Sequence, residues 1–206
     1  MKKVSFYFML LPILILMLSG CVSISRSPSP RFYRLTSISQ ESSGGDFKMK
    51  SGAVIGIGPI KIPEYLNRPQ IATVDKNRMI TFAQFDRWAE PLDLSMLRVL
   101  SENLASSMAG GDVEMYPWNM LIPVRLQVAL DVMQIDVEFE KDLIFVVRWS
   151  VLDIKNKSLV FSRRTVLKEP VKSSNYSQVA AALSSVLRRL GNEIIQELSQ
   201  VTIQDK

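Results

Sequence analysis

"VRLQVALDVMQIDV", residues 124–137, alternates apolar and polar side chains, which is typical of a β-strand with one face in the core. The apolar side chains fall on every second position and then change phase once: they are Val124, Leu126, Val128, Leu130 and Val132, followed by Ile135, Val137 and Phe139. One extra residue in a period-two pattern is the mark of a β-bulge. The stretch therefore predicts a long strand with a bulge near Met133.

Two more strands are expected beside this one. Residues 140–142 can turn the chain, and residues 143–154, LIFVVRWSVLDI, return with one apolar face. That face carries Phe145, Val147, Trp149 and Val151. Residues 155–157 turn the chain again, before a third strand at 159–168. The three strands predict an antiparallel meander, and we expect its charged face, with Arg148, Arg163 and Arg164 beside acids, to be solvated.

Two helices are expected from apolar residues spaced three or four apart. The first begins near Pro91 and ends at Gly110-Gly111, with an apolar face of Leu94, Leu97, Leu100, Leu104 and Met108. The second covers about residues 176–200, with a stripe of Val179, Leu183, Val186, Leu190, Ile194 and Leu198. We interpret this stripe as core-facing, and a partner-binding stripe is the alternative.

Shorter strands are expected earlier in the chain and between the helices, at residues 31–38, 53–63, about 70–75, 79–82 and 113–117. Strands mixed with helices favour an α/β fold class. We predict a single domain over residues 31–206, built from a mixed β-sheet with a C-terminal antiparallel meander and packed helices.

The N-terminus has the layout of a secretory signal peptide. Residues 1–3 are positively charged after Met1, and residues 4–18 are almost entirely apolar. This run is shorter than the roughly 20 residues of a transmembrane helix, and Pro12 interrupts it. We predict that residues 1–20 are removed, and an uncleaved N-terminal anchor is the alternative.

The end of this segment, Leu18-Ser19-Gly20-Cys21, matches the bacterial lipobox. Small residues beside the scissile bond give the processing enzymes access, and only a thiol offers the nucleophile for thioether formation. Cys21 is the only cysteine of the chain, so a disulfide is not expected. We predict that Cys21 carries the lipid, and that residues 21–30, rich in Ser and Pro, form a flexible tether.

The composition argues against several functions. The chain has no histidine, which excludes Ser-His and Cys-His nucleophile pairs and imidazole metal ligands. A net charge of +5, part of it in the signal, is too small and too scattered to indicate nucleic-acid binding. Acids crowd one segment, at Asp131, Asp136, Glu138 and Glu140, but solvent-facing strand positions explain them better than a catalytic pair. We predict no enzyme activity, no metal and no cofactor.

Three stretches behind the lipobox carry a family resemblance. They are "RFYRL" at 31–35, "VIGIGPIKIPEYLNRPQI" at 54–71 and "FDRWAEPLDLSMLRVLSENL" at 85–104. In this order they resemble the ABC-type transport auxiliary lipoproteins of the PqiC and YmbA kind. The most specific positions are Pro63, Leu66, Arg68 and Pro69, followed by Arg87, Trp88, Ala89, Glu90 and Pro91. The resemblance implies an α/β domain without enzyme activity, acting in intermembrane lipid transport with an MCE-domain protein that bridges the periplasm.

The motif residues suggest a folding role and a binding role, and both stay open. Proline fixes the backbone of a turn, as expected at Pro63 and Pro69. Leu66 and Trp88 are expected to anchor their loops on the domain. Arg68 or Arg87 could pair with Glu64 or Glu90 and hold the two loops together. The same residues are the candidate partner surface.

The resemblance also implies a location. Bacterial lipoproteins are sorted largely by the residue after the cysteine, which is Val22 here rather than the aspartate that retains lipoproteins in the inner membrane of enterobacteria. We therefore expect an outer-membrane lipoprotein that faces the periplasm, with several copies around one bridge. The alternative function is a periplasmic lipid carrier with its own apolar cavity.

Overall fold

The structure is a computed structural model that describes residues 27–37, 54–108 and 113–201. The strands are β1 (Arg31–Tyr33), β2 (Val54–Lys61), β3 (Gln70–Val74), β4 (Ile80–Trp88), β5 (Val113–Met115), β6 (Val124–Val137), β7 (Asp142–Asp153) and β8 (Ser158–Pro170). The helices are the 3-10 helix η1 (Glu64–Leu66) and the α-helices α2 (Leu92–Ser107) and α3 (Tyr176–Leu198). The predicted α/β domain is confirmed, with its strands divided between two sheets.

The larger sheet contains the predicted meander. Its strand order is β5-β2-β6-β7-β8, with β6, β7 and β8 antiparallel and β2 parallel to both of its neighbours. The register of β6 against β7 shifts between Val132 and Gln134, which leaves Met133 as the extra residue of a bulge. The predicted bulge is therefore confirmed at the residue where the apolar pattern changes phase.

The smaller sheet, in the order β1-β4-β3, differs from the expected strands in extent. β4 reaches Trp88, well beyond the expected 79–82, because its second half pairs with both β1 and Gln70. β1 is shorter than expected, since the backbone leaves the sheet after Tyr33 and turns toward α3. There the N–H of Thr36 donates to Ser184 Oγ at 3.2 Å.

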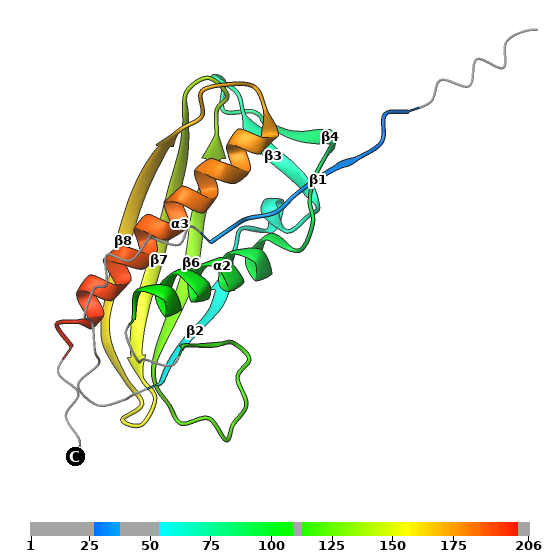
Figure 1. Cartoon of the computed structure of the whole chain (residues 1–206). Coiled ribbons are helices and arrows are strands. Elements are labelled where there is room, and N and C mark those ends of the chain that lie inside the picture. The colour runs from blue at the N-terminus through cyan, green and yellow to red at the C-terminus, as the bar shows by residue number, and fades with distance from the viewer. Residues whose placement is uncertain (1–26, 38–53, 109–112, 202–206) are drawn as a thin grey trace, which may run out of the picture.

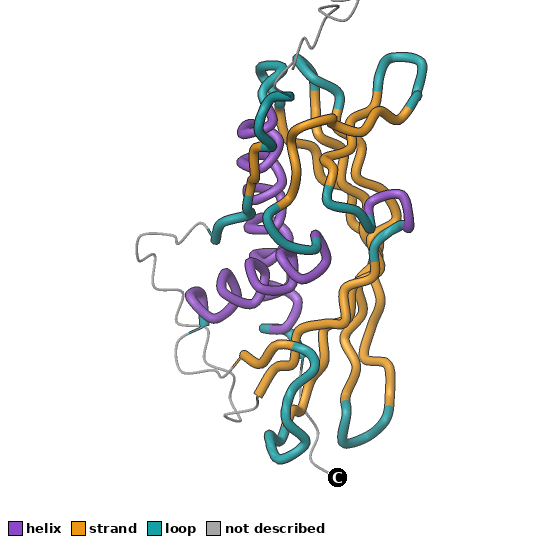
Figure 2. The backbone as a smooth tube through the Cα atoms, turned by 90° about the vertical axis from the view of Figure 1, so that its right-hand side faces the viewer, coloured by secondary structure: helices purple, strands orange, loops and turns teal. Residues whose placement is uncertain are grey.

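Both α-helices cover one face of the larger sheet, and the core lies between the two layers (Figures 1 and 2). The predicted stripe of α3 is fully confirmed, since all six of its residues are buried. The helix begins at Asn175, whose side chain accepts a hydrogen bond from the N–H of Ser177 at 2.9 Å. Gly191, on this face, packs against α2, where an added Cβ would make an ordinary van der Waals contact with Leu104 Cδ1 at 3.4 Å.

The predicted apolar face of α2 is wrong at one end. Leu94 is 53% exposed, whereas Leu92, Met96 and Val99 are buried beside the other predicted residues. The helix starts at Leu92 and packs on α3 and β2 together, so its buried face is wider than a single stripe. It ends at Ser107, and the predicted stop at Gly110-Gly111 lies outside the described residues.

Candidate functional site

The two sequence motifs meet in space around a surface hollow of about 370 Å³. Its lining residues are Phe32, Asn67, Arg68, Pro69, Trp88, Ala89, Glu90 and Pro91. We call this feature the Trp88 hollow. Six of the nine motif residues line it, namely Arg68, Pro69, Trp88, Ala89, Glu90 and Pro91, whereas Pro63, Leu66 and Arg87 do not. Phe32, on β1, was not predicted as a site residue, and its side chain is 61% exposed.

One wall of the Trp88 hollow is the turn between β2 and β3. Pro63 stands at the N-terminal boundary of η1, and its carbonyl accepts a hydrogen bond from the N–H of Leu66 at 2.9 Å. The Leu66 side chain is buried in the core, as predicted for an anchor. The N–H of Arg68 then donates to the Leu66 carbonyl at 2.8 Å, which brings Asn67, Arg68 and Pro69 to the surface.

The opposite wall is the end of β4, and backbone hydrogen bonds join it to the other elements. The N–H of Trp88 donates to the carbonyl of Pro69 at 2.7 Å, and the N–H of Ala89 donates to the carbonyl of Tyr33 at 2.8 Å. The Trp88 side chain is buried, as predicted. Three segments that are distant in sequence therefore meet at the hollow through main-chain contacts.

The predicted ion pairs between the two loops are wrong. The guanidinium carbon of Arg68 lies 3.9 Å from the centroid of the Phe82 ring, a cation–π contact. Arg87 keeps its Nε buried, and no hydrogen-bond partner for that atom lies among the described residues. The main-chain contacts already join the loops, which leaves these side chains free for other contacts.

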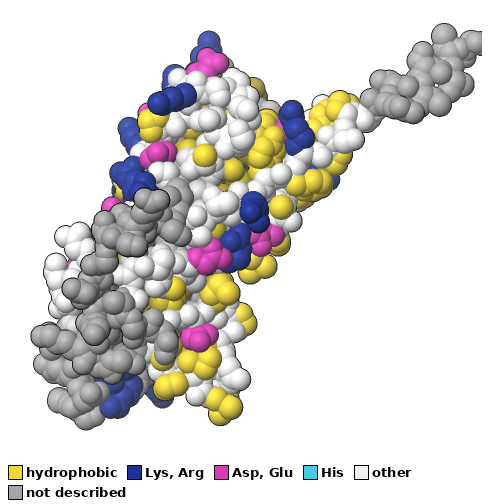
Figure 3. Space-filling view, in the orientation of Figure 1, with side chains coloured by type: hydrophobic (Ala, Val, Ile, Leu, Met, Phe, Trp, Pro, Cys, Tyr) yellow, Lys and Arg dark blue, Asp and Glu magenta, His cyan; other side chains and the backbone are white. Residues whose placement is uncertain are grey.

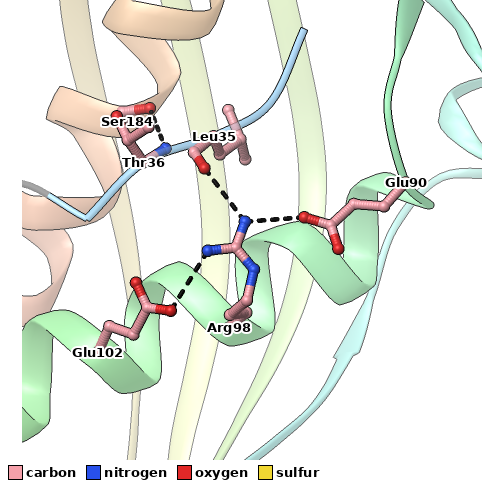
Figure 4. Close-up of polar contacts among 6 residues, drawn as sticks. All are labelled: Leu35, Thr36, Glu90, Arg98, Glu102 and Ser184. Carbon is pink, nitrogen blue, oxygen red and sulfur yellow. Dashed lines mark hydrogen bonds and ion pairs between the residues drawn. The ribbon is translucent and has the colours of Figure 1, made fainter. Parts of the chain in front are cut away.

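Glu90 pairs instead with Arg98, the seventh residue of α2 (Figure 4). Arg98 Nη2 donates to Glu90 Oε1 at 2.8 Å and to the Leu35 carbonyl at 3.1 Å. Arg98 Nη1 donates to Glu102 Oε1 at 3.3 Å. This single guanidinium connects the rim of the hollow, the segment after β1 and the exposed side of α2.

A second charged group lies beside the hollow and was missed from the sequence. Arg31 donates two parallel hydrogen bonds of 2.8 Å to the carboxylate of Asp86, and the Tyr33 hydroxyl donates to Asp86 Oδ1 at 2.7 Å. Asp86 is buried. The only signal in the sequence was an acid between Phe85 and Trp88, and its partner is 55 residues away.

Both carboxylates are held ionised by these contacts. Burial acts to raise the pKa of Asp86, but the hydrogen bonds from Arg31 and Tyr33 and the charge of Arg31 outweigh it, so the pKa lies below its ordinary value of 3.8. The hydrogen bond from Arg98 lowers the pKa of Glu90 below its ordinary value of 4.5, against the effect of burial. The two groups hold structure together rather than exchange protons near neutral pH.

The lining of the hollow combines apolar and polar residues: Phe32, Pro69, Trp88 and Pro91 stand beside Asn67, Arg68 and Glu90. The acids of β6 and its turn are dispersed, with Asp136 near Arg78 at 3.6 Å and Glu138 near Lys141 at 2.5 Å. In the part of the chain that the structure describes, no group of three or more acidic, histidine or cysteine side chains could hold a metal ion.

The lipidation site cannot be placed, because Leu18, Ser19, Gly20 and Cys21 lie outside the described residues. Over residues 27–37, 54–108 and 113–201, no helix has the length and apolar character to cross a membrane.

Comparisons with known proteins agree with the fold and identify the family. A crystal structure of an uncharacterized protein shares 16% identity with the chain at a TM-score of 0.68, covering 83% of this chain and 99% of that one. A crystal structure of protein XCC0632 from Xanthomonas campestris, with family description DUF330, also shares 16% identity and the same coverage, at a TM-score of 0.65. No curated protein sequence matches the chain. Residues 33–195 match the family described as ABC-type transport auxiliary lipoprotein component, and the chain belongs to this family.

Proposed function

We propose that this protein is the outer-membrane docking subunit of an MCE-type lipid-transport system. Lipid on Cys21 holds it to the inner leaflet of the outer membrane, and residues 22–30 tether a non-enzymatic domain in the periplasm. Membership of a transport auxiliary lipoprotein family supports the accessory role. The partner would be an MCE-domain protein anchored in the inner membrane, with several copies of this chain around its far end.

The observation that carries the proposal is the position of the Trp88 hollow. It opens beside β1, directly after the segment that would lead to the lipid, and exposed Phe32 forms part of it. Its shape is fixed by main-chain hydrogen bonds, so little ordering is needed when a partner binds. A lipid anchor confines both proteins to one membrane surface, which raises their effective concentration without further contacts.

Site-specific photocrosslinking in cells tests this assignment. A photoreactive residue at exposed Asn67, on the rim of the Trp88 hollow, should crosslink to an inner-membrane protein with MCE domains. The same residue at Asn192, exposed on α3, is the matched control. Crosslinks from both positions alike, or from Asn192 alone, would show that the hollow is not the contact.

The lipid-carrier alternative makes a different prediction. A carrier retains cargo when it is purified, whereas a docking subunit does not. Phospholipid extracted from the purified soluble domain, made without the signal and Cys21, at about one molecule per protein would favour the carrier. It would shift the role of the hollow from docking to lipid binding.

A further inference from the structure

We infer that the loop between β5 and β6, residues 116–123, is a second membrane contact that inserts Met120 and Leu121 into the surface of an anionic bilayer. We call it the Met120 loop. The inference does not depend on the docking role of the Trp88 hollow. The Met120 loop lies at the opposite end of the molecule from the β3–β4 hairpin (Figure 1).

The tip of the Met120 loop exposes two large apolar side chains almost completely. Met120 is 96% exposed and Leu121 is 89% exposed. The chain carries no charge between Glu114 and Arg125, and this interval includes the amphipathic rings of Tyr116 and Trp118. Isolated exposed apolar residues are common on soluble proteins. Two adjacent ones at a loop tip, with Tyr and Trp beneath them, have the composition of a membrane-interface segment.

The loop is held in this conformation by its own base. The N–H of Tyr116 donates to the Ile57 carbonyl at 2.9 Å, and the Tyr116 and Trp118 rings meet edge to face at 5.5 Å. Trp118 packs directly on Gly56, where even a Cβ would lie 2.6 Å from the indole ring. The tip is therefore anchored to β2 by its aromatic residues.

The turn at the tip is also fixed. Asn119 Oδ1 accepts a hydrogen bond from the N–H of Leu121 at 2.9 Å, and the Asn119 carbonyl accepts one from the N–H of Ile122 at 2.9 Å. Met120 and Leu121 are thus presented outward in a preformed loop rather than folded back onto the domain.

Positive charge lies at the same end of the molecule as the apolar tip and favours a lipid surface over a protein groove. The β7–β8 turn, with Lys155 and Lys157, is at the same end of the molecule as the Met120 loop (Figures 1 and 2). The two are linked at their bases, where the N–H of Ile154 donates to the Arg125 carbonyl at 3.0 Å. The nearby acid Asp153 is already paired with Arg125 at 2.9 Å. Lysines at the same end of a domain as an apolar tip suit anionic headgroups.

The position of the loop is compatible with attachment to the same membrane as the tether. Hydrophobic side chains gather beside the N-terminal segment and again at the lower end of the same side, with charged side chains between the two groups (Figure 3). Nine residues of extended chain, 22–30, span on the order of 30 Å. A domain tethered by that length can lie with this side on the bilayer.

Fluorescence from a single labelled position tests the inference on the full chain. An environment-sensitive fluorophore is attached to Leu121→Cys, and the protein is reconstituted into vesicles of phosphatidylethanolamine and phosphatidylglycerol. The matched control is Ser173→Cys, an exposed position in the β8–α3 connection at the other end of the molecule. We expect a blue shift at position 121, with quenching by nitroxides on the acyl chains, and neither effect at position 173. Adding Met120→Asp should reverse the shift while the circular dichroism spectrum stays unchanged.

Three results would overturn the inference: aqueous emission at position 121 in anionic vesicles, equal shifts at positions 121 and 173, or a shift that appears only after an envelope protein extract is added. The last result would assign the loop to a protein partner. The unsubstituted chain is labelled in parallel. Label on Cys21 would refute the lipid anchor of the proposed function, and the loop is then measured in the Cys21→Ser background, so the two failures are distinguishable.

Discussion

The main-chain N–H of Trp88 donates to the carbonyl of Pro69 at 2.7 Å, and this contact unites two motifs that are 19 positions apart in the sequence. Because main-chain atoms make it, the side chains of both motifs are available for other tasks. Leu66 and Trp88 point into the core, while Arg68 and Glu90 reach the rim of the hollow. The buried motif residues thus hold the fold, while their exposed neighbours form the surface that we propose as the partner contact.

Asp86→Asn should lower the stability of the domain at neutral pH, and the stability of the variant should change less when the pH is lowered. The pKa of Asp86 is lower in the folded protein than in the unfolded chain, so the unfolded chain binds the proton more readily. The ionised carboxylate therefore stabilises the fold fully above the ordinary pKa of 3.8. This stabilisation is lost as the pH falls through the lower pKa of the folded protein. The melting temperature should fall by several degrees at pH 7. It should differ less between variant and parent at pH 3. An equal difference at both pH values would contradict the role given to the Arg31–Asp86 pair.

Arg98→Met should destabilise the domain by about 1–2 kcal/mol, since it removes hydrogen bonds to two carboxylates and a main-chain carbonyl while keeping the apolar stem. Glu102→Gln is the control, because it weakens only an exposed pair one turn along α2, worth about 0.3–0.5 kcal/mol. Chemical denaturation measures both. Equal effects would mean that the contacts to Glu90 and the Leu35 carbonyl contribute nothing measurable.

Patterns within one element could be predicted from the sequence, and contacts between distant elements could not. The bulge near Met133 and the α3 stripe follow from local periodicity, which burial then enforces. The extent of β4 depends on β1, whose parallel pairing joins Arg31 to Asp86 across 55 positions. The error at Leu94 has the same origin, because the buried face of α2 is set by two packing partners.

Only some residues around the Trp88 hollow could be predicted from the sequence: Arg68, Pro69, Trp88 and Glu90 line it, but Pro63, Leu66 and Arg87 do not, and the contacts of the charged residues could not be predicted. Turn prolines and aromatic anchors are recognisable because each acts through its own backbone or its own burial. Glu90 pairs with Arg98 and not with Arg68 or Arg87, because the direction in which α2 leaves β4 brings Arg98 to Glu90. The sequence did not indicate Phe32 as a site residue, because an aromatic residue in a strand is expected to be buried, whereas Phe32 in the short strand β1 is exposed.

Leu190→Asp should unfold the domain or lower its melting temperature severely, because a buried charge without a partner is costly. Asn192→Asp introduces the same charge on the same helix at an exposed position, and should leave the melting temperature nearly unchanged. Thermal unfolding followed by circular dichroism compares the two. Should both variants melt like the parent, the α3 stripe would be an interface rather than core.

Cys21→Ser should leave an unprocessed, lipid-free precursor, since we predict that the Cys21 thiol accepts the lipid. The parent should carry three acyl chains on its new N-terminus, enough for stable anchoring where a single chain binds only marginally. Intact-mass spectrometry of the membrane-extracted protein distinguishes the two. An unmodified thiol in the mature parent chain would refute the anchor.

Val22→Asp should move the protein to the inner membrane and impair transport while leaving the domain folded. The substitution lies in the tether, outside the core that runs from Leu35 to Leu198, so the melting temperature should not change. Relocation would separate the Trp88 hollow from the far end of a bridge anchored in the inner membrane, and the gain in effective concentration would be lost. Sucrose-gradient fractions show where the variant resides, and Val22→Ala, which should stay in the outer membrane, controls for the substitution itself. Full lipid-transport activity of a Val22→Asp variant confirmed in the inner membrane would mean that the protein does not act by docking at the outer membrane.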